Sequence, residues 1–67
     1  MKKKRKTTYS VTQTDDEGTR TLINDASTAR NAAARAAALD PAINEFALAS
    51  SWSFHTGSAY YQIGQNS

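Results

Sequence analysis

The sequence contains no cysteine, a single proline and no long run of apolar residues. Without cysteine, disulfide bonds and thiolate metal sites are excluded, and small secreted scaffolds held by disulfides are disfavoured. No stretch approaches the roughly 20 apolar residues of a membrane helix, and polar residues 7–10 stand where a secretory signal would have its apolar segment. We therefore expect a cytoplasmic protein, or a nuclear one if the host is eukaryotic, without membrane contact.

The chain is short, and its 67 residues allow one domain. A fold of this size buries only about 60% of the surface of its unfolded chain, which leaves little room for a deep active-site cleft. Phosphate-binding glycine motifs, clusters of metal ligands and the G-x-S-x-G motif are all absent, and the lone His55 reads most simply as a turn residue. We therefore expect no enzyme activity, no catalytic residues, no metal and no cofactor.

The charges are divided unevenly along the chain. From Thr7 onward, the chain contains three arginines and six acidic residues, which give this part a net charge of −3. The cationic side chains of residues 2–6 repel one another, and this segment has nothing apolar to bury. The sequence therefore predicts a disordered basic arm at 1–7, a domain at 8–64 and a frayed end at 65–67. The arm carries five cations, Lys2, Lys3, Lys4, Arg5 and Lys6.

Such an arm favours contact with the phosphates of a nucleic acid, because each neutralised phosphate releases counterions. A nuclear localisation signal and a merely solvated tail are the alternatives. Arginines expected on the outer face of the helix would extend the same cationic set, although solvated helix arginines are the simpler interpretation. The residues that we expect to contact nucleic acid or an acidic partner are Lys2, Lys3, Lys4, Arg5, Lys6, Arg30 and Arg35.

Alternating side chains predict a β-hairpin in the first third of the domain. In residues 8–14, Tyr9, Val11 and Gln13 alternate with hydroxyl-bearing residues. The DDEG cluster at 15–18 is typical of a turn, and residues 19–24 form the returning strand.

Residues 25–41 predict an alanine-rich helix, since eight of the eleven residues from Ala29 to Leu39 are Ala or Leu. Asp25 or Ser27 would cap its start, and the Asp40-Pro41 pair would end it. The inner face of this helix would consist of Ala29, Ala32, Ala33, Ala36 and Leu39.

Residues 44–54 fit either a helix or a strand. As a helix, the segment would follow an Asp40 cap with Pro41 in its first turn. As a strand, its large side chains at every second position share one face, and this alternation favours a strand from about residue 45. A turn at 55–58 would lead to a last strand at 59–63, in which Tyr60 points away from the core.

Together these elements predict an α+β fold of order β-β-α-β-β, with one small antiparallel sheet and a single helix packed on one face. The inner face of the sheet would carry Val11, Leu22 or Ile23, Phe46, Leu48, Trp52, Phe54, Tyr61 and Ile63.

The hairpin turn also offers a contact for a protein partner. Its three acids lack the spacing of a calcium loop, and turn chemistry or an acidic knob facing a basic groove explains them better. An exposed tyrosine is a second candidate contact. The expected protein contacts are Asp15, Asp16, Glu17 and Tyr60.

In its layout over residues 8–63, the chain resembles the small phage-encoded inhibitors of bacterial defence, anti-CRISPR proteins among them. The DDEGT turn, the STAR opening of the helix and the strand-rich second half carry this resemblance. It implies a non-enzymatic protein that binds a protein or nucleoprotein complex and inhibits or modulates its handling of nucleic acid. The alternatives are a small DNA- or RNA-binding regulator, and a structural or assembly subunit that acts as a homodimer.

Overall fold

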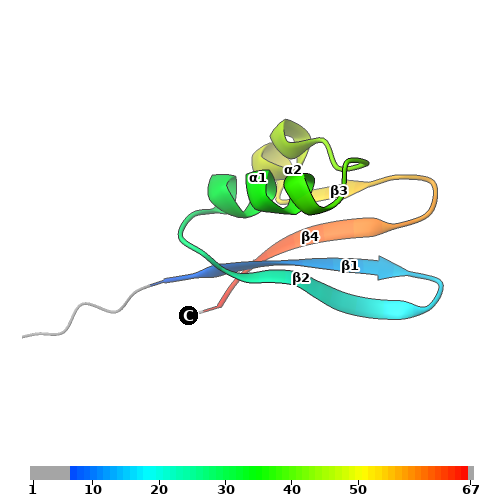
Figure 1. The fold of residues 1–67 in the computed structure, drawn as a ribbon, viewed down its shortest axis with the longest axis horizontal. Helices are drawn as coiled ribbons and strands as arrows, with labels where there is room; N and C mark the ends of the chain where they lie inside the picture. Colours follow the sequence, from blue (N-terminus) through cyan, green and yellow to red (C-terminus); the bar gives the residue numbers. More distant parts are fainter. Residues whose placement is uncertain (1–6, 67) are drawn as a thin grey trace, which may run out of the picture.

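The computed structural model describes residues 7–66; Met1, the five cations of the arm and Ser67 lie outside the described residues. It confirms a small α+β fold with one antiparallel sheet, but two helices are present rather than the single helix that the sequence predicts (Figure 1). In chain order the elements are β1 (Tyr9–Asp15), β2 (Gly18–Ala26), α1 (Ala29–Leu39), α2 (Glu45–Ser51), β3 (Ser53–His55) and β4 (Tyr60–Gln65).

The sheet has the strand order β2-β1-β4-β3, so the first and last strands lie side by side at its centre. Their pairing runs from Tyr9 opposite Gln65 to Thr14 opposite Tyr60. Both helices lie on the same face of the sheet (Figure 1). Asn66, which follows β4, also bonds to the residue before β1, because its backbone N–H donates to the Thr8 carbonyl at 2.8 Å. The sequence predicts fraying from residue 65, and in the structure β4 extends to Gln65.

The first hairpin confirms the predicted turn. The Asp15 carboxylate accepts a hydrogen bond from the Glu17 backbone N–H at 2.9 Å, an Asx turn that closes the loop. Gly18 follows with φ +125°, a conformation that residues with a Cβ rarely adopt. Two irregularities in the β1–β2 pairing add residues to β2, so that both Ile23 and Ala26 point into the core.

Helix α1 begins later than either predicted cap would allow, by one residue for Ser27 and by three for Asp25. Thr28 is the N-cap, and its hydroxyl accepts from the Asn31 backbone N–H at 3.0 Å, so the proposed caps Asp25 and Ser27 are wrong. The C-terminal boundary before Pro41 is confirmed. Three alanines of the inner face, Ala32, Ala33 and Ala36, are fully buried, whereas the predicted Ala29 is half-buried and Leu39 is 62% exposed.

Helix α2 replaces the strand that the sequence favours for residues from 45 onward. Asn44 is its N-cap, and the side-chain oxygen accepts from the backbone N–H groups of Phe46 and Ala47. Trp52 ends it in the left-handed conformation, with φ 60°, and its N–H donates to the Leu48 carbonyl at 2.7 Å. This reversal leads directly into β3. The alternation of large residues from 46 to 54 thus runs across a helix and a strand, and does not mark one strand.

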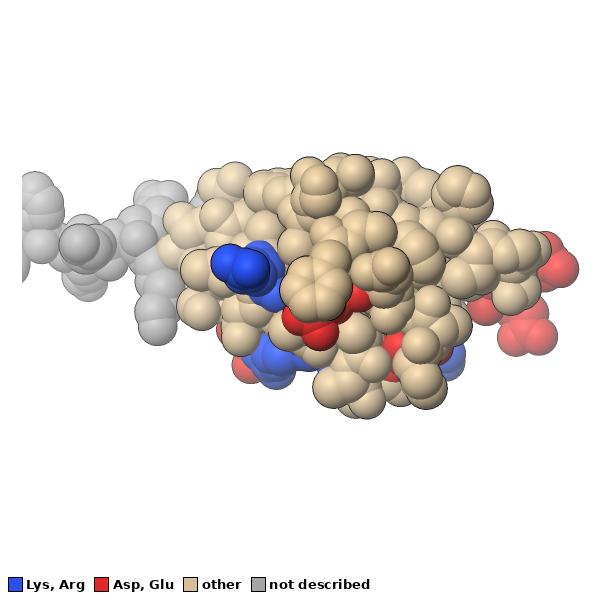
Figure 2. All heavy atoms as spheres, turned by 90° about the horizontal axis from the view of Figure 1, so that it is seen from above, with Lys and Arg blue, Asp and Glu red and all other residues tan. Residues whose placement is uncertain are grey.

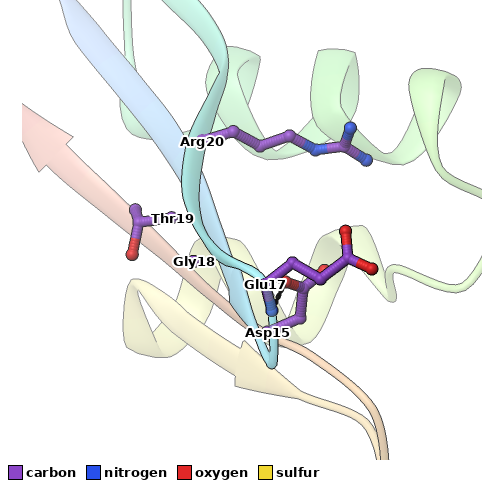
Figure 3. A pocket seen from close by; sticks show the side chains of 5 residues that line it. All are labelled: Asp15, Glu17, Gly18, Thr19 and Arg20. Carbon is purple, nitrogen blue, oxygen red and sulfur yellow. Dashed lines mark hydrogen bonds between the residues drawn. The ribbon is translucent and has the colours of Figure 1, made fainter.

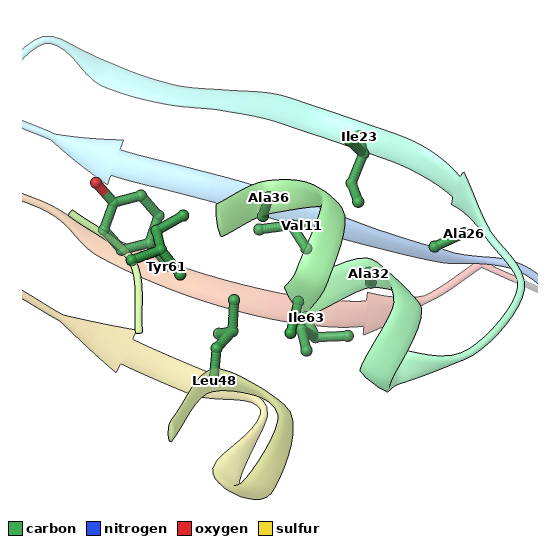
Figure 4. Packing of buried hydrophobic residues seen from close by; sticks show 10 residues of the cluster. Val11, Ile23, Ala26, Ala32, Ala36, Leu48, Tyr61 and Ile63 are labelled. Atoms are coloured by element: carbon green, nitrogen blue, oxygen red, sulfur yellow. The ribbon is translucent and has the colours of Figure 1, made fainter. Parts of the chain in front are cut away.

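The core lies between the two helices and the sheet (Figure 4). Leu48 points from α2 toward the sheet and is fully buried, as predicted, and Val11, Ile23, Tyr61 and Ile63 are buried too. Two of the predicted core aromatics are at the surface, because Phe46 is 70% exposed and Trp52 is 40% exposed. Leu22 and Phe54 are only partly buried.

The opposite environments of Leu48 and Phe46 give a matched test of the second helix. Leu48→Ala should lower the free energy of unfolding by about 2–4 kcal/mol, because it removes the largest fully buried side chain. Phe46→Ala, at an exposed helix position, should change it by less than about 0.5 kcal/mol. Urea unfolding followed by circular dichroism measures both. Similar losses for the two variants would mean that both side chains share a buried face, as in the strand.

Candidate interaction surfaces

A chain of hydrogen bonds fixes the linker between the helices to the sheet. Arg20 Nε donates to Gln13 Oε1 at 2.8 Å, Gln13 Nε2 donates to Tyr61 Oη at 3.3 Å, and Tyr61 Oη donates to Asp40 Oδ2 at 2.6 Å. These residues come from β2, β1, β4 and the C-cap of α1. Gln13 is the buried polar residue of the core, and these bonds satisfy both ends of its amide.

The last of these bonds shifts two pKa values in opposite directions. The hydrogen bond from the Tyr61 hydroxyl, together with that from the Ala42 backbone N–H, lowers the pKa of Asp40 below its ordinary value of 3.8. The same bond to Asp40, followed by burial, raises the pKa of Tyr61 above its ordinary value of 10.0. Over the whole physiological pH range the pair therefore consists of an ionised Asp40 carboxylate and a neutral Tyr61 phenol. In this state it positions the helices on the sheet.

The acidic hairpin end consists of Asp15, Asp16 and Glu17. Asp15 and Glu17 line a shallow hollow with Gly18, Thr19 and Arg20, and their carboxylates project to the same side of the strands as Arg20 (Figure 3). Acidic side chains stand out at this end when the molecule is seen from the helix side (Figure 2). Within residues 7–66 the one ion pair is elsewhere, between Arg35 and Asp25, so no cation in this range forms an ion pair with the hairpin carboxylates.

Tyr60 lies at the same end of the sheet as the acidic hairpin but on the opposite face. It pairs with Thr14 on one side and His55 on the other, and it is 42% exposed. The next residue, Tyr61, and its cross-strand partner Gln13 are buried on the helix side, which places Tyr60 on the opposite face of the sheet, away from α1 and α2. The sequence thus places Tyr60 correctly at the surface, yet it does not share one continuous face with Asp15 and Glu17.

The two helix arginines have separate surroundings. Arg35 pairs with Asp25 at 2.8 Å, and both side chains are largely exposed, so the pair adds little stability. Arg30 lines a shallow hollow with Phe46, Ala49 and Ser50 of α2. The predicted cationic set is therefore not one strip within residues 7–66. The five cations of the arm, Lys2, Lys3, Lys4, Arg5 and Lys6, lie outside the described residues.

Sequence reasoning missed the surface formed by Phe46 and Arg30, because it placed Phe46 in the core. An Asn44 cap followed closely by four strong helix formers, Glu45, Ala47, Leu48 and Ala49, was the signal that could have shown α2. In a helix, Phe46 and Leu48 point in different directions, so one of them must leave the core. Phe46 is the more exposed of the two by a wide margin, at 70% against 0%.

Comparison of the chain with protein-family models, curated proteins and solved structures found no match. Within residues 7–66 no three His, Asp or Glu side chains are grouped closely enough to hold a metal ion. None of the helices in this part of the chain has the length and apolar character needed to span a bilayer.

The Tyr61–Asp40 bond predicts a defined pH dependence of stability. Tyr61→Phe should lower the free energy of unfolding near pH 7 by about 1–3 kcal/mol, because Asp40 and Gln13 both lose a partner. The lowered pKa of Asp40 makes this contribution present above about pH 4 and lost as pH falls through the folded-state pKa. The raised pKa of Tyr61 makes it disappear again as pH rises past about 10.

Thermal unfolding of the two proteins across the pH range measures this difference. The neighbouring variant Tyr60→Phe is the control, because its hydroxyl has no hydrogen-bond partner within residues 7–66 and its loss should change stability little. A Tyr61→Phe protein as stable as the parent at pH 7, or a difference that persists unchanged in acid, would refute the role of this bond.

Proposed function

We propose that the chain is a non-enzymatic binding protein that inhibits or modulates a nucleic-acid-handling complex, in the manner of the small phage-encoded anti-defence inhibitors that its layout resembles. The observation that carries the proposal is that exposed Phe46 and Arg30 line the same hollow on the helix layer. Phe46 is 70% exposed and shares a shallow hollow with Arg30. The acidic hairpin end supplies a second, oppositely charged surface.

Phe46 and Arg30 have the composition of a protein contact. Aromatic residues and arginine are enriched among the side chains that dominate binding energy, and an exposed phenyl ring gains by leaving water. The helix positions around them, Ala49 and Ser50, are small and leave the ring accessible. A partner surface with an apolar side chain beside a carboxylate fits this pair, because the carboxylate would meet the Arg30 guanidinium.

The link to nucleic acid comes from the charge distribution of the chain. The five cations at residues 2–6 suit a phosphate backbone, whereas the body from Thr7 onward has a net charge of −3. A body of this sign does not compete with the arm for phosphate. The acidic hairpin end, with Asp15, Asp16 and Glu17, suits the basic channel in which a nucleic-acid-handling protein holds its substrate. We infer that the basic arm contacts the nucleic acid of a nucleoprotein complex and that the acidic hairpin end contacts its protein.

A pull-down with a tagged full-length chain from bacterial lysates, before and after nuclease treatment, tests the proposal. A nucleic-acid-handling complex should be retained after nuclease treatment. Phe46→Ser and Arg30→Gln should each reduce that retention about tenfold or more, because each removes a central contact. Leu39→Ser is the matched control: Leu39 is also an exposed apolar residue of the helix layer, at 62%, but does not line the Arg30 hollow.

Retention that Leu39→Ser reduces as much as Phe46→Ser would contradict the assignment of the surface. Retention that disappears with nuclease treatment would contradict a protein partner altogether. Each variant is first checked for cooperative unfolding, so that a loss of retention reports on contact rather than on folding.

A further inference from the structure

The groove between the two helices has charges of opposite sign toward its two ends. Arg30, in the first turn of α1, lines one hollow with Ala49 and Ser50 from the last turn of α2. A short linker joins the end of α1 to the start of α2, so the two helices run in roughly opposite directions. Glu45, in the first turn of α2, therefore lies toward the end of α1, away from Arg30.

Phe46 projects from the outer side of this helix layer. In α2 it shares a face with Ala49 and Ser50, three and four residues further along, whereas Leu48 is buried against the sheet. The small side chains around it leave the phenyl ring 70% exposed. Glu45 immediately precedes it in the chain, so the first turn of α2 presents an apolar ring next to a carboxylate.

Both charges beside Phe46 are unpaired within residues 7–66. The one ion pair in this range joins Arg35 to Asp25, so neither Arg30 nor Glu45 has an oppositely charged partner there. Arg30 is exposed and Glu45 is half-buried. A neighbouring molecule can therefore neutralise both charges without breaking an ion pair of the described fold.

The surface contains both a hollow and the groups that fit it. An apolar side chain beside a carboxylate suits the hollow of Arg30 and Phe46, and the pair of Phe46 and Glu45 is such a combination. A two-fold axis near Phe46 brings Glu45 of one copy to Arg30 of the other, and the symmetry forms this contact twice. The charges thus favour a second copy of this chain as the occupant.

We propose that two copies of the chain pair through their helix layers in an isologous homodimer, with the two Phe46 rings near the axis and a contact between Arg30 and Glu45 on each side of it. Burial of the rings supplies the apolar contribution, and the charge contacts fix the orientation. The dimer occupies the surface that we propose for the protein partner, so the two contacts exclude one another.

Sedimentation equilibrium of the purified full-length chain tests the proposal, over about 1–1,000 µM, a range that includes the affinities of small interfaces. The mass should rise to twice that of the chain. Phe46→Ser should weaken pairing about tenfold or more, because it removes the ring at the axis. Leu39→Ser is the matched control and should leave pairing unchanged. Leu39 is exposed too, but it lies one turn after Arg35, on the side of α1 that faces Asp25 of β2.

Reversal of the two charges gives a sharper test. Arg30→Glu and Glu45→Arg each turn both charge contacts of a homodimer into like-charge contacts, so each variant alone should pair about tenfold more weakly or worse. An equal mixture of the two variants should recover the dimer. In the mixed pair the two introduced charges meet each other on one side, and the original Arg30 and Glu45 meet on the other. An interaction within one chain cannot produce this recovery.

A chain that stays monomeric over the whole range would overturn the proposal. So would a dimer that both charge reversals leave intact, because it would form through another surface, such as the edge strand β2. A mixture no more dimeric than its components would also contradict it. The measurements use no protein partner, so their failure leaves the proposed modulator function standing. Circular dichroism first establishes that each variant is folded.

Discussion

The fold depends on the small side chains of α1 that fill the space between this helix and the sheet. Where α1 faces the strands it presents Ala32, Ala33 and Ala36, all fully buried. Methyl-sized side chains let a helix approach a sheet closely, but each buries little apolar area, and burial of apolar area is the main source of stability. A second helix is therefore needed to supply Leu48, which with Val11 is among the largest fully buried side chains.

This shallow core has consequences for the surface. A layer filled by alanine methyls, Leu48 and Tyr61 leaves little space for further rings, and Phe46 and Trp52 are accordingly left exposed or partly exposed. Trp52 still contributes locally, since its ring meets that of Tyr9 edge-on at 5.7 Å. Because both helices lie on one face, no other element of residues 7–66 packs on the opposite face of the sheet (Figure 1). The surfaces that we propose for partners thus follow from the way the small core is built.

The sequence predicted correctly those features that are determined by residues close together in the chain. The DDEG turn, the alanine helix up to Asp40 and the outward position of Tyr60 all follow from patterns within a few residues of each feature. The second helix was missed because the alternation of large residues from 46 to 54 imitates a strand, whereas the deciding features, the Asn44 cap and the left-handed Trp52, are single residues.

The contacts between distant segments could not be predicted from one sequence. The chain of bonds from Gln13 to Tyr61 and on to Asp40 joins residues 48 and 21 positions apart, and no local pattern indicates such partners. The composition of the sheet face opposite the helices depends on the strand order β2-β1-β4-β3, since only this order brings the polar residues of the two hairpins into common rows. The placement of Arg30 beside Phe46 likewise required the position of α2 against α1.

Substitution of Leu for Ala at two positions of α1 tests the close packing on which this account rests. Ala36 is fully buried, so Ala36→Leu should lower the free energy of unfolding by about 1–3 kcal/mol, although it adds apolar volume. Ala38 is exposed, so Ala38→Leu, which makes the same change in helix propensity, should alter stability by less than about 0.5 kcal/mol. Urea unfolding of both variants decides the matter: an Ala36→Leu protein as stable as the parent, or more stable, would mean that α1 does not pack closely on the sheet.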